Sequence, residues 1–218
     1  MYLLPNIKSS IDYGDEQIFV VPYAICNTIP DYFTVANNQN IYEFFYKIIN
    51  YGFFVERGKA EKNYILQQII PYVILINNKN EFLVSKRIGG DKRLLDKLSL
   101  GFGGHINPCD ISNINKLETI SNNIIRELTE ATTLNLKGIK NEPKFVGFVR
   151  NINSDLSDHL GLVYILNVKN RRPIIKETNK SESIWMNRGE MVRLIEKFDM
   201  WSQFIIASNI LENAKKEW

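Results

Sequence analysis

Residues 101–134 constrain the fold of this chain more than any other stretch of its sequence. A glycine-rich strand end, SLGFGG, is followed by a polar loop and then by a helix predicted over residues 114–131. Apolar residues recur along that helix at three- and four-residue spacing, which predicts one stripe packed on a core. The stripe comprises Leu117, Ile120, Ile124, Leu128 and Ala131. A strand, a loop and an amphipathic helix in this order favour a sheet with a helix on its face.

Two carboxylates, Glu127 and Glu130, lie beside that stripe. At 100° per residue they are about 60° apart around the helix and about one turn apart along it, so both can face one divalent ion. Glu127 lies on the flank of the stripe, where a carboxylate is partly desolvated and needs a partner. Oxygen ligands favour Mg²⁺ or Mn²⁺, which bridge phosphates and polarise water. For an isolated E-x-x-E pair the alternative is a solvated helix face.

The order of these residues resembles the signature of the Nudix hydrolase family, G-x5-E-x7-R-E-U-x-E-E-x-G-U, in which U is a bulky aliphatic residue. The matching positions are Glu118, Arg126, Glu127, Leu128, Glu130 and Leu134. Three further segments, QIIPY, SLGFGGHI and HLGLV, look like a bacterial Nudix subgroup often labelled phosphoesterase. That subgroup carries an N-terminal extension of the kind seen here.

The resemblance implies a role for each matching residue. Glu118 and Arg126 would shape the loop and the helix as a structural pair. Glu127 and Glu130 would bind the metal, and a backbone carbonyl around Gly104 would join them.

The glycine turn and a nearby basic segment supply further candidates. Gly103 and Gly104 would let the backbone approach a diphosphate closely. Arg87, in the basic segment that leads into the glycine strand, is a candidate phosphate contact, and the alternative is a solvated basic surface. His105 is either an acid-base group or a residue that hydrogen-bonds the loop.

The sequence also departs from the signature. Ala131 occupies the position of the second glutamate of the E-E pair, and Thr133 replaces the glycine. Thirteen residues separate Gly104 from Glu118, where the signature has five. Because the family uses the carboxylate at position 131 for metal binding, these departures produce a degenerate Nudix box and put catalysis in question.

Two later glutamates, Glu177 and Glu182, precede Trp185. Nudix hydrolases often supply a further glutamate from this region as a base or an extra ligand. We expect Glu182 to take that role, because it is nearer the strand that begins by Trp185.

The remaining elements predict an α/β fold, a Nudix-like α/β/α sandwich with a mixed β-sheet. Residues 66–87 form a predicted hairpin, and strands are expected over residues 144–152, 159–168 and 183–186. Pro71 suggests that the first strand lies at an edge or carries a bulge. Residues 1–60, with a strand over 17–25 and a helix over 40–50, are expected to be an N-terminal extension that packs on a Nudix-like domain at 61–218.

Composition limits the partners and the location of the chain. A formal net charge of +3 over 218 residues is too mild and too diffuse to indicate nucleic-acid binding. No window approaches the 18 apolar residues of a membrane span, so no membrane partner is expected. Cys26 and Cys109 form no metal-binding or disulfide pattern, which favours a cytoplasmic protein with reduced thiols.

The sequence therefore predicts a metal-dependent Nudix-type hydrolase that cleaves a diphosphate linkage in a nucleoside diphosphate derivative. Mg²⁺ or Mn²⁺ is the expected cofactor, and family analogy suggests a homodimer. Ala131 keeps an alternative open, a Nudix-fold domain that binds a nucleotide for regulation without turnover.

Overall fold

The computed structural model describes residues 13–27, 29, 32–35, 39–61, 63–89, 95–136, 142–151 and 158–213. The strands are β1 (Gln17–Pro22), β2 (Phe33–Val35), β3 (Phe53–Glu56), β4 (Leu66–Asn77), β5 (Glu81–Arg87), β6 (Leu98–Ser99), β7 (Gly101–Gly103), β8 (Lys144–Val149), β9 (His159–Lys169) and β10 (Ser181–Asn187). The α-helices are α1 (Tyr23–Cys26), α2 (Gln39–Tyr51), α3 (Arg57–Ala60), α4 (Lys116–Ala131), α5 (Arg188–Arg193), α6 (Met200–Ala207) and α7 (Ile210–Asn213). Two short 3-10 helices are η2 (Pro108–Asp110) and η3 (Ile195–Lys197).

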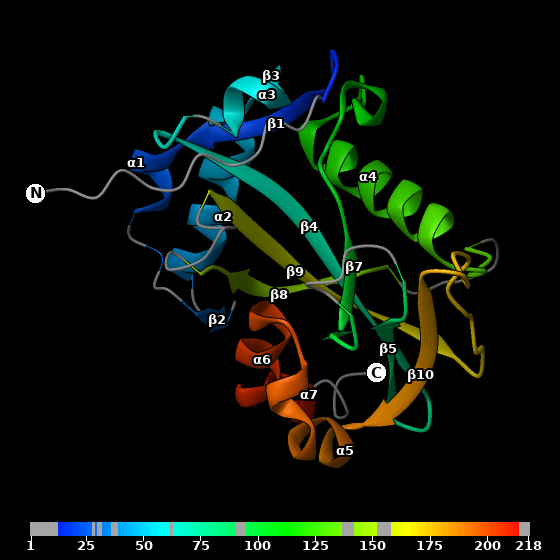
Figure 1. The fold of residues 1–218 in the computed structure, drawn as a ribbon. Coiled ribbons are helices and arrows are strands. Elements are labelled where there is room, and N and C mark those ends of the chain that lie inside the picture. Colours follow the sequence, from blue (N-terminus) through cyan, green and yellow to red (C-terminus); the bar gives the residue numbers. More distant parts are fainter. Residues whose placement is uncertain are drawn as a thin grey trace, which may run out of the picture.

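All of these strands belong to one mixed sheet, whose main path runs in the order β10-β5-β4-β9-β8-β2 (Figure 1). The two long strands at its centre, β4 and β9, run parallel, and their neighbours on the main path are antiparallel. Every residue of β4 is buried, as expected for a strand that is covered on both faces. The predicted α/β/α sandwich with a mixed sheet is confirmed.

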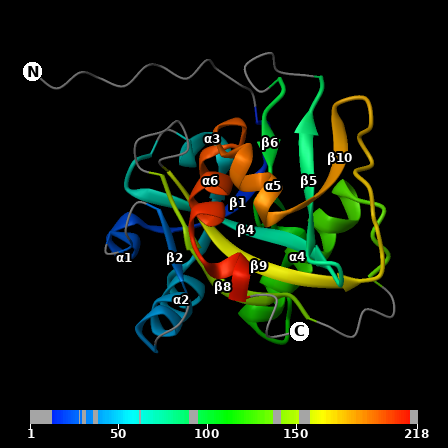
Figure 2. The same ribbon diagram turned by 90° about the horizontal axis from the view of Figure 1, so that it is seen from below.

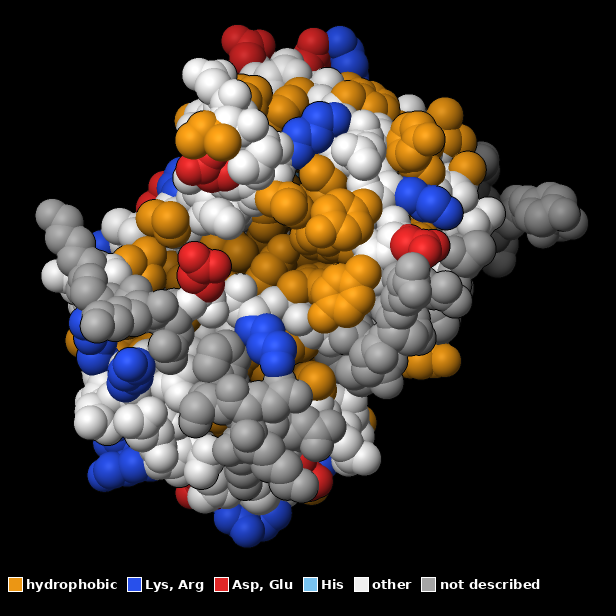
Figure 3. Space-filling model, turned by 180° about the vertical axis from the view of Figure 1, so that it is seen from behind, with side chains coloured by type: hydrophobic (Ala, Val, Ile, Leu, Met, Phe, Trp, Pro, Cys, Tyr) orange, Lys and Arg blue, Asp and Glu red, His pale blue; other side chains and the backbone are white. Residues whose placement is uncertain are grey.

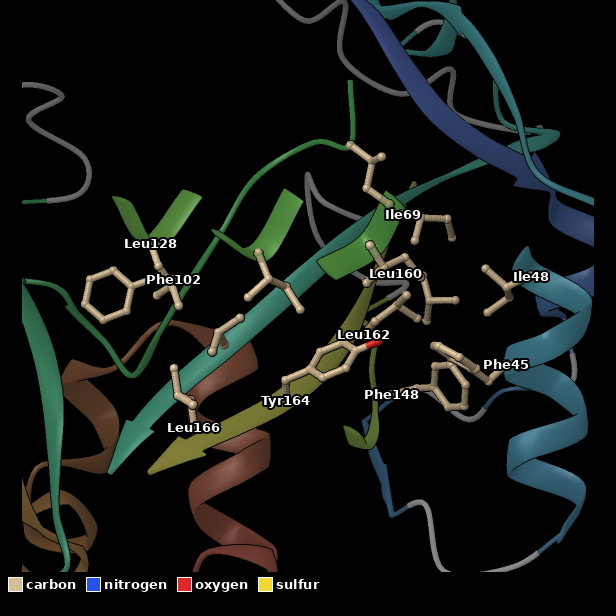
Figure 4. Packing of buried hydrophobic residues seen from close by; sticks show 14 of the residues in the cluster. Phe45, Ile48, Ile69, Phe102, Leu128, Phe148, Leu160, Leu162, Tyr164 and Leu166 are labelled. Carbon is tan, nitrogen blue, oxygen red and sulfur yellow. The ribbon is translucent and has the colours of Figure 1, made fainter. Parts of the chain in front are cut away.

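Helices cover both faces of the sheet, because successive residues of β4 and β9 point to opposite sides. Leu128 of α4 and Phe45 of α2 belong to the same buried cluster as Leu160 of β9, on one face of the sheet (Figure 4). Trp201 and Ile205 of α6 pack on the opposite face. Figure 2 shows α2 and α4 on one side of the central strands, with α5 and α6 on the other.

Pro71 lies inside the central strand β4, where the prediction placed an edge or a bulge. The strand that pairs with β4 on this side changes there. Gln68 is opposite Val20 of β1, and Tyr72 is opposite Gly103 of β7. Since proline has no backbone N–H, it is tolerated where the ladder changes partner. The predicted edge is therefore a local break in a strand that is otherwise central.

The predicted helix that carries the carboxylates is α4, which begins at Lys116. Asn115 caps it, because its side-chain oxygen accepts a hydrogen bond from the Glu118 N–H at 2.8 Å. Ile124 and Leu128 are buried as predicted, whereas Leu117 is 40% exposed. The predicted stripe is therefore wrong at its first position, one residue after the helix begins.

The segment before residue 60 adds β1, β3 and α2 to the sandwich. β1 pairs with β3 and with the start of β4, and Ile48 of α2 lies in the same core cluster as Leu128. The predicted strand over 17–25 is shorter, because the chain turns into α1 after Pro22. The domain boundary at residue 60 stays a prediction.

None of the helices within the described ranges combines the length and the apolar character needed to cross a membrane. Cys26 is buried, Cys109 is exposed, and both are free thiols. The cytoplasmic location stays a prediction.

Candidate active site

Arg126 on α4 organises the loop that joins β7 to this helix. Its Nε and Nη2 atoms donate hydrogen bonds to the two carboxylate oxygens of Asp110, both at 2.9 Å. Nη2 also donates to the backbone carbonyl of His105 at 2.9 Å and to Oδ1 of Asn107 at 3.1 Å. The third nitrogen, Nη1, donates to Oε1 of Glu127 at 2.7 Å. One guanidinium therefore joins the glycine turn, η2 and the carboxylate of α4.

The predicted pairing of Glu118 with Arg126 is wrong. Glu118 lies in the first turn of α4, and its carboxylate accepts a hydrogen bond from the hydroxyl of Ser112. It precedes Arg126 by more than two helical turns, which places it too far along the helix axis to reach the guanidinium. Asp110 occupies the position of the acidic partner.

The sequence contains a signal for Asp110 that the predicted register overlooked. Five residues separate Gly104 from Asp110, which is the G-x5 spacing of the signature with Asp in place of Glu. The extra eight residues therefore follow the acidic position and do not precede it. They form the loop after η2 and the first turn of α4.

The carboxylate of Glu127 is held against the glycine turn. A Cβ atom placed on Gly104 would lie 2.3 Å from Oε1 of Glu127, so only glycine allows this close approach. Burial raises the pKa of Glu127, and this effect outweighs the lowering by the neighbouring guanidinium of Arg126. A partly buried carboxylate of this kind is stabilised by a further cation.

A cavity of about 300 Å³ opens between this turn, α4 and the segment before β10. Its lining residues are Ser85, Arg87, Ser99, Gly101, Phe102, Gly103, Glu127, Glu130, Ala131, Ile175, Glu177 and Ser181. The structure thus brings together four predicted site residues in one cavity, Arg87, Gly103, Glu127 and Glu130. Gly104 contacts Glu127 beside it, and Arg126 lies behind Glu127.

Glu177, and not Glu182, is the later glutamate that lines this cavity. β10 pairs with β5 in a register that places Glu182 opposite Lys86 and Ser181 opposite Arg87. Because side chains alternate along a strand, Glu182 points to the face opposite that of Ser181. The choice of Glu182 is therefore wrong, and its place in the strand is the reason.

A second cavity, of about 280 Å³, extends the first towards α6. The two cavities share Ser85, Arg87 and Ser99, so they form one cleft. Lys97 and Gln203 line the extension. Asp199 also lines the extension, where its carboxylate accepts hydrogen bonds from Ser99 and Ser202. The end of the cleft at α4, with three glutamates, is the more acidic one, and Arg87 lies where the two cavities meet.

The side chain of His105 points away from the cleft into a buried network. Its Nε2 atom lies 2.6 Å from Oε1 of Gln68, whose amide nitrogen donates to Asp158 at 2.9 Å. Asp158 in turn lies 2.8 Å from Nδ1 of His159. Burial, assisted by the positive charge of Arg57, lowers the pKa of His105 to about 3. A neutral His105 that tethers the glycine turn fits the loop-stabilising interpretation.

The residues at the acidic end fit a divalent cation. Mg²⁺ in proteins is commonly held by one or two carboxylates together with substrate phosphates, and it keeps several waters. Glu127, Glu130 and the closely approaching backbone of Gly104 match that donor set. In the described part of the chain, no group of three or more His, Cys, Asp or Glu side chains is placed to hold a metal. Ala131 leaves this set one carboxylate short.

This chain is similar to known proteins both in sequence and in structure. Protein YmaB of Bacillus subtilis strain 168 is 31% identical over 163 residues, which cover 72% of this chain and 77% of YmaB. The crystal structure of Tm1382, a protein assigned to the Nudix hydrolases, superposes with a TM-score of 0.73 at 26% identity. The superposition covers 91% of this chain and all of Tm1382. No protein-family model matches the chain.

A weaker structural match is also found. It is a bifunctional NMN adenylyltransferase/ADP ribose pyrophosphatase from Francisella tularensis, complexed with AMP and a Mn ion. It is 19% identical, its TM-score is 0.49, and the match covers 68% of this chain and 42% of that one. Its ligands are properties of that protein alone.

Proposed function

This chain belongs to the Nudix family, and we propose that it hydrolyses a diphosphate linkage in a nucleoside diphosphate derivative. The observation that carries the proposal is the placement of Glu127. Its carboxylate is half-buried, lies against the backbone of Gly104 and lines the same cavity as Glu130 and Arg87. A pocket that joins one half-buried carboxylate, one exposed carboxylate and a cationic side chain suits a metal-bound diphosphate.

Each residue of the cleft has a distinct part in this proposal. Glu127 and Glu130 would hold Mg²⁺ or Mn²⁺, with the carbonyl of Gly104 as a further ligand. The bound ion would neutralise phosphate charge and lower the pKa of a water molecule. Arg87, at the junction of the two cavities, contacts the phosphate oxygens.

Glu177 replaces Glu182 as the proposed general base. It lines the cavity that holds Glu127 and Glu130, and its side chain is 57% exposed. A solvated carboxylate on that wall orients the attacking water and accepts its proton.

Arg126 is a positioning residue. Its guanidinium lies 2.7 Å from Oε1 of Glu127 and 3.5 Å from Oε2 of Glu130. It directs one oxygen of Glu127 and leaves the other, Oε2, to a metal ion. The Asp110 pair prevents Arg126 from moving into the cleft.

The test is a hydrolysis screen of the full chain with nucleotide sugars, dinucleoside polyphosphates, ADP-ribose and nucleoside triphosphates, with and without Mg²⁺ or Mn²⁺. We expect metal-dependent release of a nucleotide from at least one class. Glu127→Gln should abolish that release while its thermal midpoint stays close to that of the parent chain. A fully active, metal-dependent Glu127→Gln variant contradicts the assignment.

Ala131 supports a second candidate function, a nucleotide-binding regulatory domain. With one carboxylate missing, Nη1 of Arg126, held behind Glu127, lies 2.7 Å from Glu127 and 3.5 Å from Glu130 and offsets part of their negative charge without a metal ion. In that case the screen gives saturable nucleotide binding that does not depend on metal, and no product. The homodimer and the exclusion of nucleic-acid and membrane partners stay predictions.

A further inference from the structure

A separate cavity of about 330 Å³ lies at the other end of α4, near its N-terminus. Its lining residues are Phe19, Ile49, Gly52, Phe54, Ile106, Ile111, Ser112, Lys116, Thr119 and Ile120. They come from β1, β3, the end of α2 and the residue after it, the segments on either side of η2, and the first turns of α4. The face of the molecule that carries α2 and α4 is hollowed, and hydrophobic side chains gather around the hollow (Figure 3).

The walls of this cavity are apolar, and the polar groups in them are already paired. The rings of Phe19 and Phe54 meet edge to face with centroids 5.5 Å apart. The backbone N–H of Ser112 donates to Oγ1 of Thr119 at 3.0 Å, and the Ser112 hydroxyl donates to Glu118. A ligand in this cavity therefore gains little from neutral hydrogen-bonding groups and much from apolar surface.

Lys116 gives the cavity a single charge. Its Nζ donates one hydrogen bond to the backbone carbonyl of Asn50 at 3.0 Å. An ammonium has three donors, so two of them are left for a ligand. Of the described residues that line the cavity, none is acidic. A ligand that matches the charge of this cavity therefore carries one anionic group, placed beside Lys116.

We propose that this cavity binds a small apolar monocarboxylate, with the hydrocarbon part between Phe19 and Ile120 and the carboxylate at Lys116. The volume supports a ligand of this class. A cavity of about 150 Å³ lined by apolar side chains holds one benzene molecule, so about 330 Å³ accepts a ring with a short chain, or an eight-carbon chain.

Binding here would also affect the candidate active site. Ile106 and Ile111 line the cavity and flank the segment that carries Asp110, the partner of Arg126. A ligand packed against both isoleucines stabilises the segment that holds Arg126 on Glu127. The binding proposal is independent of the proposed hydrolase, and only the effect on turnover rests on it.

The test measures binding of octanoate and of 3-phenylpropanoate to the full chain by titration calorimetry, each against its neutral amide. The two acids distinguish an aliphatic from an aromatic ligand. We expect saturable binding of at least one acid, with about tenfold weaker binding of the matching amide because it lacks the charge.

Two substitutions locate the site. Lys116→Gln should remove the preference for the acid and leave the affinity of the amide unchanged. Lys47→Gln, on an exposed position of α2, is the matched control and should change neither. Ile111→Trp fills the mouth and should weaken the acid and the amide alike, with the thermal midpoint measured to verify folding.

Absence of saturable binding by either acid overturns the proposal, as does equal binding of acid and amide. A preference for the acid that survives Lys116→Gln also overturns it, because the anion would then bind elsewhere. These measurements need no turnover, so their failure is distinct from failure of the proposed hydrolase.

Discussion

The Asp110–Arg126 pair gives a quantitative prediction that separates two interpretations of the sequence. The side chain of Asp110 is 2% exposed and accepts hydrogen bonds from Arg126 twice, from the backbone N–H of Asn107 at 2.9 Å and from Asn123 at 3.2 Å. In Asp110→Asn, one acceptor oxygen becomes an NH₂ group that faces at least one of these donors. Removing one partner of a buried ion pair lowers the free energy of unfolding by about 3–5 kcal/mol.

We expect the low end of that range, about 3 kcal/mol, because Arg126 is 24% exposed and keeps Glu127 as a partner. For a chain of 218 residues, about 1 kcal/mol shifts the thermal midpoint by roughly 2–4 °C, so the expected fall is about 6–12 °C. Glu118→Gln is the matched comparison. It removes a charged acceptor for Ser112 and a charge in the first turn of α4, which together cost about 0.5–1 kcal/mol.

Urea unfolding followed by circular dichroism measures both variants, with the slope on denaturant checked for constancy. If Glu118→Gln destabilises the chain as much as Asp110→Asn, the assignment of Asp110 as the partner of Arg126 is wrong.

The same pair has a defined pH dependence. Burial alone would raise the pKa of Asp110, but the hydrogen bonds from Arg126, Asn107 and Asn123 outweigh it and hold this pKa below its usual range. A carboxyl whose folded pKa is depressed contributes stability above its unfolded pKa of about 3.9 and loses it as the pH falls. The difference in unfolding free energy between the parent chain and Asp110→Asn should therefore shrink below about pH 4.

Three further predictions concern the cleft and its supporting loop. Glu177→Gln should lower kcat of the metal-dependent hydrolysis by about 10²-fold or more, as for loss of a general base. Glu182→Gln, on the opposite face of the strand, should leave kcat within about twofold of the parent value. A larger loss of kcat in Glu182→Gln than in Glu177→Gln would restore Glu182 as the base. Gly104→Ala should lower kcat roughly hundredfold, because its Cβ would lie 2.3 Å from Oε1 of Glu127 and displace that carboxylate. Steady-state kinetics at saturating metal concentration measure this effect. An unchanged kcat counts against the close approach of Gly104 to Glu127. His105 has a folded pKa of about 3, below its unfolded value near 6.5, so its contribution to stability is present above pH 6.5 and is lost as the pH falls below it. Unfolding free energies at pH 7 and pH 5 should therefore differ less in His105→Gln than in the parent chain, and an equal difference argues against a buried neutral imidazole.

The sequence predicted well those helices and strands whose positions follow from the pattern of apolar residues within a single element. The hairpin of β4 and β5, the helix α4 and the strands β8 and β9 follow the apolar pattern of their sequences, and each lies within a few residues of its predicted bounds. The exposed Leu117 shows the limit of that pattern. Periodicity states which residues share a face, but the first turn of a helix packs only where another element reaches it.

The candidate site also contains residues that local sequence pattern places and residues that only tertiary contacts place. The carboxylates of α4 lie one turn apart on one helix, so their common direction follows from helix geometry alone. By contrast, Glu177 and Glu182 are five residues apart, and the pairing of β10 with β5 decides which of them faces the cleft. Strand register is a property of the assembled sheet, and a shift of one residue exchanges the two faces.

The sequence by itself determined the family resemblance, the sandwich class and the pair of carboxylates on α4, because spacing and periodicity within one element carry that information. Only the tertiary structure decided that Asp110 and not Glu118 meets Arg126, because that contact joins a loop to a helix across 15 intervening residues. Because of the eight-residue insertion, Glu118 has the spacing to Arg126 that the signature requires. It nevertheless lies in the first turn of α4, too far along the helix to reach Arg126. Contacts between elements depend on where the chain returns in space, which linear spacing does not encode.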